Sequence, residues 1–470
     1  MTFNKINLFS MYIMTKCKDG LSLEECELTI LRMAVDKADQ NVKKRKINSP
    51  IIKKIISIVE NFIKTNQLIV YGGTAINSIL PVEDQFYNKE IELPDYDFFS
   101  IDAFNDAKKL ANYYYKEGFT EVEAKSGIHT GTYKVFVNFI PIADITQLNG
   151  IIFKSIKKDS IIKEGIHYTP PNFLRMSLFL ELSRPDGDTS RWEKLLKRIT
   201  LLNKNYPLKS KNCNKIDFQR KSVNIKNVEN IYTTIKNTFI EEGVVFFGGY
   251  AISLYSDYMP SDLKQKFQKF PDFDVLSIHP EKTAEKIKNK LHKYGNIRIV
   301  KHKSIGEVIS EHYEIIVNKD TVAFIYKPLA CHSYNIIKSN QKSVKIATID
   351  TMLSFYLAFL YANQPYYDVE RILCMSQYLF KVQQENRLEQ KGLLRRFSIL
   401  CYGHQETLEE IRAEKTRKYM ELKSKRGTKE YDMVFMRYRP QDNKSQENKY
   451  QKTYKRPKSN YTYTKKRKYY

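Results

Sequence analysis

The chain of 470 residues is long enough for two or three domains that each bury a core. Its 78 lysines and arginines against 53 aspartates and glutamates leave a net charge of +25, which favours nucleic acid as a polyanionic partner. No apolar run approaches the ~20 residues that cross a bilayer, and the N-terminus lacks a signal-peptide cleavage pattern. We therefore expect neither a membrane partner nor secretion.

The cysteines and histidines do not form a metal-binding pattern. The six cysteines are scattered without a C-x-x-C pair, so they predict neither a zinc site nor a disulfide framework. Free buried thiols are typical of a reducing compartment, so we expect an intracellular protein. His129 is interpreted as a surface-loop residue.

Residues 1–47 are predicted to be an N-terminal helical extension, with a helix over 22–46. Ser49 and Pro50 then give the N-cap and first-turn signal of a second helix. Its apolar residues recur with helical spacing and form one stripe: Ile52, Ile55, Ile56, Val59, Phe62 and Ile63. This amphipathic helix leads into a short apolar strand that ends near Tyr71.

A glycine pair follows that strand, in the sequence YGGTAIN. Gly72 and Gly73 have no Cβ, so the backbone there can approach a phosphate closely. A helix that begins at this point directs its free N–H groups at the anion, and the Thr74 hydroxyl can add a hydrogen bond. We expect these three residues to hold a nucleotide triphosphate.

Acidic residues follow on two predicted strands. Asp95 and Asp97, in PDYDFFS, leave one face of a strand, and Tyr96 leaves the other. Asp144 ends the apolar run that begins at Tyr133 and offers a third carboxylate on a neighbouring strand. Such oxygens suit Mg²⁺, and two ions together can activate a hydroxyl and stabilise a leaving pyrophosphate. A lone Gly-Gly or Asp-x-Asp is more often an ordinary turn or strand end; the ordered combination indicates nucleotidyl transfer.

The first unit continues with a helix over 103–116 and a helix–turn–helix segment over 167–206. The basic residues of this hairpin either contact triphosphate or RNA, or form an ordinary solvated surface: Arg175, Arg191, Lys194, Lys197 and Arg198. We assign residues 48–206 to a catalytic nucleotidyltransferase lobe and residues 207–224 to a basic linker.

A second copy of the unit follows over 225–400. FGGYAISLYSDYMP and PDFDVLS repeat the order of YGGTAINSILP and PDYDFFS, and helices are predicted before and after them and over 346–381. The second copy keeps its glycines and the pair Asp272 and Asp274. Tyr250 stands in the place of Thr74, and two extra residues in the turn put Tyr326 opposite Asp144. We therefore expect the second lobe to be degenerate.

The C-terminal residues differ in composition from the two lobes. Residues 401–436 are predicted to be a charged helix, and 437–470 a disordered tail rich in basic residues and tyrosine. Cations bind phosphates and aromatic rings stack on bases, so the tail is interpreted as RNA-binding. The basic residues in question are Lys455, Arg456, Lys465, Lys466, Arg467 and Lys468. A solubilising tail or a nuclear-localisation-like run is the alternative.

The fold class is therefore α/β (α+β). It consists of two tandem nucleotidyltransferase-like lobes, each a small mixed sheet with flanking helices and a following helical hairpin, and a basic tail.

YGGTAIN, PDYDFFS, IPIADIT and YTPPNFLRMSLFLELSRPDGDTSRWEKLLKRITLLN, in this order, resemble the poly(A) polymerase catalytic subunits of large nucleocytoplasmic DNA viruses, of giant-virus type and distantly poxvirus-like. The resemblance runs over about residues 50–380. It implies addition of AMP from ATP to mRNA 3′ ends with Mg²⁺ or Mn²⁺. Gly72, Gly73 and Thr74 would hold the triphosphate, and Asp95, Asp97 and Asp144 the metals.

The resemblance also implies partners and a location: RNA, ATP, and a second copy of the chain or a viral cap methyltransferase, in the host cytoplasm or viral factory and also in the virion. Two alternatives stay open. The enzyme could add uridylate or another nucleotide, or the chain could be a non-catalytic RNA-binding processivity factor.

Overall fold

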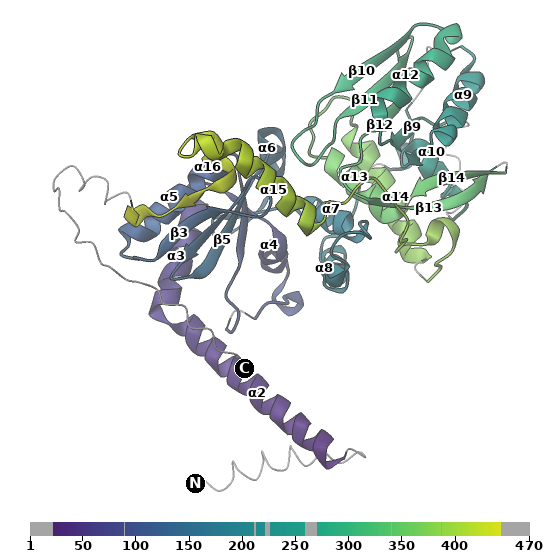
Figure 1. Cartoon of the computed structure of the whole chain (residues 1–470). Helices are drawn as coiled ribbons and strands as arrows, with labels where there is room; N and C mark the ends of the chain where they lie inside the picture. The colour runs from purple at the N-terminus through teal and green to yellow at the C-terminus, as the bar shows by residue number, and fades with distance from the viewer. Residues whose placement is uncertain are drawn as a thin grey trace, which may run out of the picture.

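The computed structural model describes residues 22–88, 90–210, 213–220, 226–258, 270–339, 341–386 and 388–442. Two lobes lie side by side, each built on a mixed eight-stranded sheet with helices against it (Figure 1). The α/β architecture with two tandem lobes that the sequence predicts is confirmed.

The N-terminal helices differ in burial. α2 (Leu23–Asn48) begins at Ser22, which forms a capping box with Glu25, and none of its residues is buried. Figure 1 shows it extending away from the first lobe. α3 (Pro50–Thr65) is amphipathic as predicted and buries Ile52, Ile55, Val59, Phe62 and Ile63.

The sheet of the first lobe contains parallel and antiparallel strands. Across the sheet they lie in the order β16-β3-β4-β5-β2-β1-β7-β6. β2 pairs in parallel with β5 and antiparallel with β1. The elements are β1 (Ile69–Val70), α4 (Gly72–Ile79), η1 (Val82–Asp84), β2 (Tyr96–Ser100), α5 (Ala103–Lys116), β3 (Val122–Ser126), β4 (Thr132–Val137), β5 (Ile140–Gln147), α6 (Gly150–Lys158), β6 (Ile161–Lys163), β7 (Ile166–Tyr168), α7 (Pro171–Leu182), η2 (Thr189–Arg191) and α8 (Trp192–Asn205).

Strand periodicity divides the two faces of β2. Tyr96 donates a hydrogen bond to Glu60 of α3 (2.5 Å), and the ring of Phe98 lies 6.5 Å from that of Phe62, also on α3. These two residues therefore face the helices. Asp97, between them, faces the opposite side of the sheet.

The second lobe repeats this plan in the strand order β10-β11-β12-β9-β8-β14-β13-β15. The two lobes also share a β-bulge. The strand register shifts between Val135 and Phe136 in the β4–β5 hairpin and between Ile315 and Ile316 in the β11–β12 hairpin. The elements are α9 (Val228–Glu241), β8 (Val245–Phe246), α10 (Gly249–Ser253), η4 (Ser256–Tyr258), β9 (Phe273–Leu276), α12 (Pro280–Leu291), η5 (His292–Tyr294), β10 (Ile297–His302), β11 (His312–Val317), β12 (Asp320–Tyr326), β13 (His332–Ser339), β14 (Lys342–Ala347), α13 (Ile349–Phe359), α14 (Val369–Glu385), η6 (Gly392–Leu394) and β15 (Cys401–Tyr402); η3 (Cys213–Lys215) precedes them in the linker.

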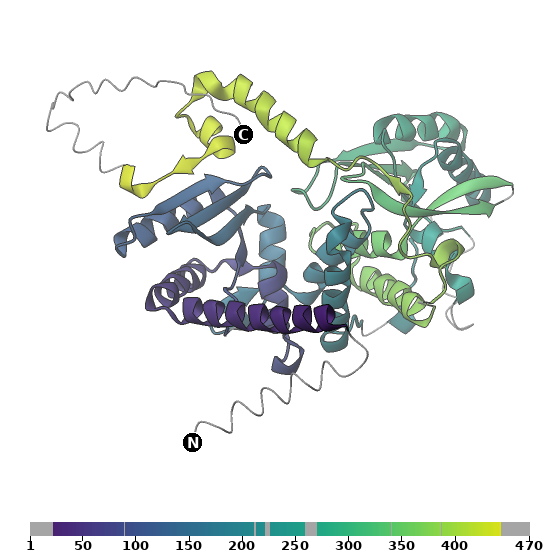
Figure 2. The same cartoon turned by 60° about the horizontal axis from the view of Figure 1, so that its bottom comes forward.

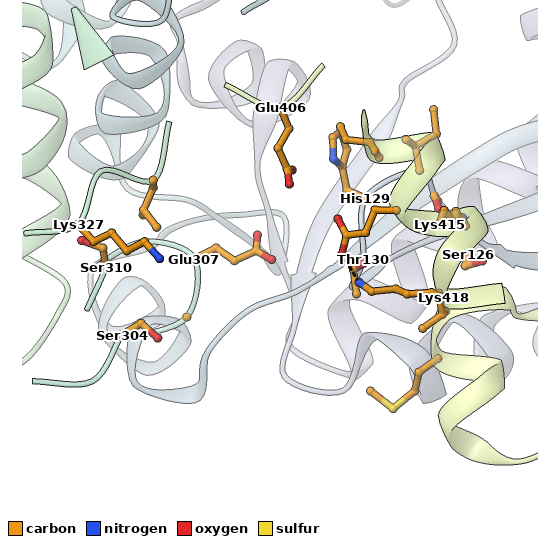
Figure 3. Close-up of a pocket in the computed structure, with 18 of the residues that line it drawn as sticks. Ser126, His129, Thr130, Ser304, Glu307, Ser310, Lys327, Glu406, Lys415 and Lys418 are labelled. Carbon is orange, nitrogen blue, oxygen red and sulfur yellow. Dashed lines mark hydrogen bonds and ion pairs between the residues drawn. The ribbon is translucent and has the colours of Figure 1, made fainter. Parts of the chain in front are cut away.

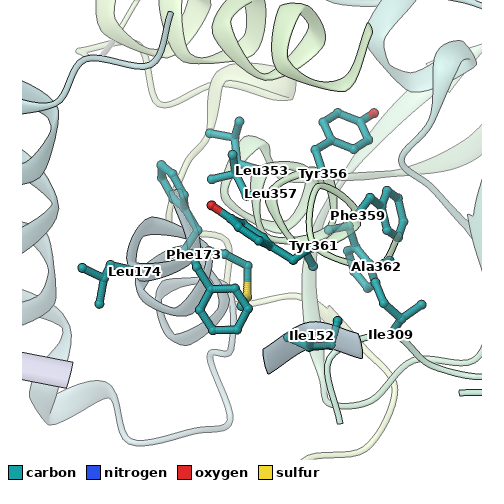
Figure 4. Close-up of a cluster of buried hydrophobic side chains, with 14 of the residues drawn as sticks. Ile152, Phe173, Leu174, Ile309, Leu353, Tyr356, Leu357, Phe359, Tyr361 and Ala362 are labelled. Carbon is teal, nitrogen blue, oxygen red and sulfur yellow. The ribbon is translucent and has the colours of Figure 1, made fainter. Parts of the chain in front are cut away.

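The lobes share one hydrophobic core, because α7 of the first packs against α13 of the second. Figure 4 shows Phe173 and Leu174 of α7 beside Leu353 and Leu357 of α13. The rings of Phe173 and Tyr361 are 5.2 Å apart at an edge-to-face angle. The first lobe, which carries the three carboxylates, is therefore held against the second lobe through the packing of α7 on α13.

After β15 the chain returns to the first lobe. α15 (Leu408–Leu422) crosses from one lobe to the other (Figure 2), and η7 (Lys423–Lys425), α16 (Lys429–Phe435) and β16 (Arg437–Tyr438) follow. β16 pairs with β3, Arg437 forms an ion pair with Glu123, and Tyr438 donates a hydrogen bond to Asn112 (2.8 Å).

Two expectations for this region need correction. Residues 401–436 are not a single helix, and residues 437–442 belong to the fold because β16 completes the edge of the first sheet. The rest of the predicted tail, with all six basic residues proposed to bind RNA, lies outside the described residues.

The prediction of free thiols is wrong for two pairs. Cys213 and Cys374 form a disulfide, as do Cys331 and Cys401. Their partners are 161 and 70 residues apart, so only the folded chain reveals the pairing. Across the part of the chain that the structure describes, no helix combines the length and apolarity needed to span a membrane.

Candidate active site

Three carboxylates lie at one place on the open face of the first sheet. Asp97 of β2 and Asp144 of β5 are register partners in the parallel ladder, and Asp95 lies directly before β2. Because residues two apart on a strand share a face, Asp95 and Asp97 both face away from α3 and α5. The structure thus brings together the three acidic residues that the sequence singled out.

The carboxylates carry more negative charge than their surroundings balance. Burial, then the charges of Asp95 and Asp144, raises the pKa of Asp97 to about 7. Burial and the charge of Asp144 also raise the pKa of Asp95. Lys134 of β4 forms an ion pair with Asp144. Among the described residues the three carboxylates do not gather within 4.8 Å of one another.

The glycine turn lies against these carboxylates. Gly72 has a φ of +73°, and a Cβ there would come within 2.8 Å of the Asp97 Oδ2. The Tyr71 N–H donates to the Asp97 carbonyl (2.9 Å), and the Thr74 hydroxyl donates to the Asp95 carbonyl (2.6 Å). The start of α4 is therefore fixed directly beside the acidic residues, with room only for glycine.

Cations gather on the other side of the turn. A Cβ on Gly73 would lie 2.8 Å from Arg198 Nη2, and Arg198 donates to the Tyr87 hydroxyl (2.7 Å). The charges of Arg198 and Arg191, together with partial burial, lower the pKa of Lys194. Arg191, Lys194 and Arg198 thus form a cationic cluster near the start of α4, where an anion would also meet free helix N–H groups.

The other two basic residues of the hairpin have different surroundings. Arg175 is buried and bonds to Asn203 (2.7 Å) and Asn172 (2.5 Å). Lys197 pairs with Glu193 on the exposed side of α8. Sequence spacing alone could not separate these two from the cationic cluster.

In the second lobe the corresponding position is closed by an arginine. Arg220, from the linker, pairs with Asp272 (2.7 Å) and Asp274 (2.8 Å) and lies 4.6 Å from the centre of the Phe324 ring. A Cβ on Gly249 would come within 2.6 Å of Asp272 Oδ1. The guanidinium therefore supplies the positive charge that the pair needs, and little space is left for a ligand. Nothing in the sequence indicates this contact, because Arg220 and Asp272 are 52 residues apart.

The expected counterpart of Asp144 needs correction. Asp274 pairs in the parallel ladder with Phe324, not with Tyr326, which pairs with Leu276. The two hairpins have turns of equal length and bulges at the same place, so the alignment needs no extra residues in the turn. The third carboxylate is nevertheless absent from the second lobe, as predicted from the sequence, with phenylalanine in its place.

A cavity of about 640 Å³ opens between the lobes and the C-terminal helices. Figure 3 shows Lys327 of the second lobe on one side and Lys415 and Lys418 of α15 on the other, with Glu307 and Glu406 between them. His129 also lines this cavity and is exposed, which agrees with a loop position. The lysines offer phosphate contacts close to the first sheet.

Comparison with known proteins agrees with this geometry. Residues 57–188 match the sequence model of a family described as "Poly(A) polymerase catalytic subunit". A protein of Acanthamoeba polyphaga mimivirus, described as "Putative poly(A) polymerase catalytic subunit", is 33% identical over 177 residues, which are 36% of this chain and 30% of the relative. Proteins of African swine fever virus with the same description are 31% identical; that of the Kenyan isolate matches over 172 residues, 35% of this chain and 36% of its own.

The aligned region thus spans about a third of the length of these curated relatives. The crystal structure of the Megavirus polyadenylate synthase superposes with a TM-score of 0.73 over 93% of this chain and 92% of that one, at 19% identity. The resemblance seen in the sequence is confirmed, and the two-lobed fold is shared over nearly the whole chain.

Proposed function

We propose that the chain is a template-independent poly(A) polymerase that adds AMP from ATP to the 3′ ends of mRNA. The observation that carries this is the first-lobe arrangement: three carboxylates on one sheet face, directly beside a glycine turn and a cationic cluster. The matches to poly(A) polymerase catalytic subunits support it.

The donor set of Asp95, Asp97 and Asp144 fits a divalent metal, Mg²⁺ or Mn²⁺. Hard oxygen ligands suit these ions. Burial and the charges of Asp95 and Asp144 raise the pKa of Asp97, and a bound cation would balance those charges. When bound, the metal supplies positive charge that lowers the pKa of the attacking hydroxyl and neutralises the departing pyrophosphate.

The remaining residues of the site bind and orient the substrates. Gly72, Gly73 and the first N–H groups of α4 cradle the triphosphate, and the cationic cluster holds its distal phosphates. The 3′ oxygen of RNA then displaces pyrophosphate from the α-phosphorus, and Asp144, the register partner of Asp97, receives the hydroxyl proton. The lysine-lined cavity would bind the RNA strand, together with the six basic residues of the C-terminal tail: Lys455, Arg456, Lys465, Lys466, Arg467 and Lys468.

One incubation tests this proposal. Purified chain with labelled oligo-RNA, Mg²⁺ and each nucleoside triphosphate in turn should extend the RNA with ATP far better than with the other three. Preference for UTP would instead assign a uridylyltransferase, and tight RNA binding without transfer would assign a processivity factor. Mn²⁺ in place of Mg²⁺ tests the choice of ion.

Assembly and location are part of the same proposal. We infer that the chain works with a second copy or with a viral cap methyltransferase, in the host cytoplasm and in the virion. Light scattering on the purified chain, alone and with such a methyltransferase, tests the partners, and immunoelectron microscopy tests the location.

A further inference from the structure

A second cavity, of about 850 Å³, adjoins the carboxylate site. Its walls come from both lobes and the C-terminal segment and are mostly apolar. The lining residues used below are Phe99, Thr146, Phe173, Ser177, Arg184, His332 and Phe355. His129, Thr130 and Arg184 also line the lysine-containing cavity, so the two spaces are neighbours.

Strand geometry places this cavity next to the metal ligands. Phe99 follows Asp97 by two residues on β2, and Thr146 follows Asp144 by two on β5, so both lie on the carboxylate face about 7 Å further along. Tyr71, which precedes the glycine turn, stacks on Phe99 with ring centroids 4.0 Å apart and shares a hydrogen bond with Thr146 (2.9 Å). A nucleotide held by its phosphates at the turn thus has an aromatic-lined space beside it for its base.

Two polar groups at the wall of this cavity have no partner. His332 is 1% exposed, and neither ring nitrogen forms a hydrogen bond within the described chain. The Nε of Arg184 is likewise buried and unpaired. Buried polar atoms without a partner are rare in folded proteins, because each costs the loss of its hydration. They therefore point to a ligand that completes them.

The imidazole is neutral and offers both kinds of hydrogen bond. Burial, together with the charge of Arg184, lowers the pKa of His332 to about 3. One ring nitrogen is therefore a donor and the other an acceptor. The ring lies 5.0 Å from that of Phe355, which gives the same wall an aromatic surface.

We propose that this cavity receives the adenine ring of the incoming nucleotide and that His332 and Arg184 recognise its edge, an inference that rests on the proposed function. Adenine presents an amino donor beside ring-nitrogen acceptors. The imidazole accepts from the amino group, and the Arg184 Nε–H donates to a ring nitrogen. Guanine carries a carbonyl acceptor where adenine has the amino group, and an N1–H donor where adenine N1 accepts, so the Arg184 Nε–H would face a second donor. The ring nitrogens of His332 and the Nε of Arg184 are shielded in the free chain, so the proposal requires both side chains to turn toward the cavity when the base binds.

This assignment gives the second lobe a role in the reaction. His332 and Phe355 belong to that lobe, whereas the carboxylates belong to the first. A lobe that carries out no transfer would thus form the wall that selects the base.

The test uses the full chain with labelled oligo-RNA and measures single-nucleotide addition with ATP and with GTP. His332→Ala should lower the preference for ATP over GTP about tenfold or more, mainly through KM for ATP. Ser177→Trp, on an exposed position of α7 that lines the cavity, should raise KM for ATP without changing KM for RNA. His404→Ala, on the surface (side chain 70% exposed), should behave as the wild type.

The outcomes separate this inference from the proposed function. If the wild type transfers no nucleotide, the proposed function fails. If the wild type prefers ATP but both cavity variants keep its preference and its KM for ATP, the base site lies elsewhere. If Ser177→Trp raises KM for RNA and leaves KM for ATP unchanged, the cavity binds the RNA 3′ end and the inference is overturned.

Discussion

Asp144 of β5 and Phe324 of β12 hold the same register position in the two lobes. Asp144 pairs across the parallel ladder with Asp97, and Phe324 pairs in the same way with Asp274. Beside Phe324 lies the guanidinium of Arg220, which pairs with both remaining acidic residues of that lobe. The second lobe therefore neutralises its acidic pair with its own arginine, whereas we propose that the first lobe takes up a divalent cation.

Arg220→Ala should lower the free energy of unfolding by about 3–5 kcal/mol, because it leaves two buried carboxylates without their partner. Urea denaturation followed by circular dichroism measures this loss. Lys197→Ala, which breaks an exposed pair with Glu193, is the control and should change stability by less than about 0.5 kcal/mol. A loss below about 1 kcal/mol for Arg220→Ala would show that the ion pairs do not hold the second lobe together.

Gly72→Ala should abolish most nucleotide transfer, because its methyl group would press on Asp97 Oδ2 and its φ of +73° is unfavourable for alanine. Gly118→Ala is a matched control: its φ is +96°, but nothing lies within 4 Å of the new Cβ. Both variants should lose about 1 kcal/mol of stability or more from backbone strain. Only Gly72→Ala should lose activity, and equal activity in the two would refute a close approach at the turn.

Lys194→Ala should raise KM for ATP about tenfold and change kcat little, because the lost charge contacts phosphates in both ground and transition states. Lys197→Ala, one turn further along α8 and already paired with Glu193, should leave KM within about twofold. Steady-state kinetics at fixed ionic strength distinguishes the two. Equal effects would mean that the lysines act only through net charge.

The free energy of unfolding of the metal-free chain should fall as the pH rises from about 4 to about 7. The pKa of Asp97 is about 7 in the folded chain and about 3.9 when unfolded, so the folded state binds more protons in this window. Ionisation therefore destabilises the fold, and the effect is complete above pH 7. Asp97→Asn should raise Tm at pH 8 and reduce this slope, and Mg²⁺ should raise Tm of the wild type there. If the stability of the Asp97→Asn variant depended on pH in the same way as that of the wild type, Asp97 would not be the group with the raised pKa.

Much of the fold follows from periodicity that is visible in the sequence. The apolar stripe of α3 and the repeated glycine–aspartate order locate the helices, the strands and the carboxylates of both lobes. The side-chain pattern does not separate Tyr326 from Phe324, because both positions are aromatic and a two-residue shift keeps every side chain on the same face. The strand register, not the side-chain pattern, identifies Phe324.

Contacts between distant segments could not be predicted. Arg220 reaches the second-lobe carboxylates from a basic linker whose composition suggests only solvation. β16 has two residues, and it is held by Glu123 and Asn112 about three hundred positions earlier. His332 lies in an ordinary strand and gains its significance only from the cavity that the two lobes and α16 enclose.

The most direct test of the account compares Asp144→Asn with the double variant Asp272→Asn and Asp274→Asn in single-nucleotide addition to oligo-RNA, with folding checked by circular dichroism. Asp144→Asn should slow transfer about a thousandfold, whereas the folded double variant should stay within a few-fold of the wild type. Near-normal transfer by Asp144→Asn, or its loss in the folded double variant, would contradict the assignment of catalysis to the first lobe.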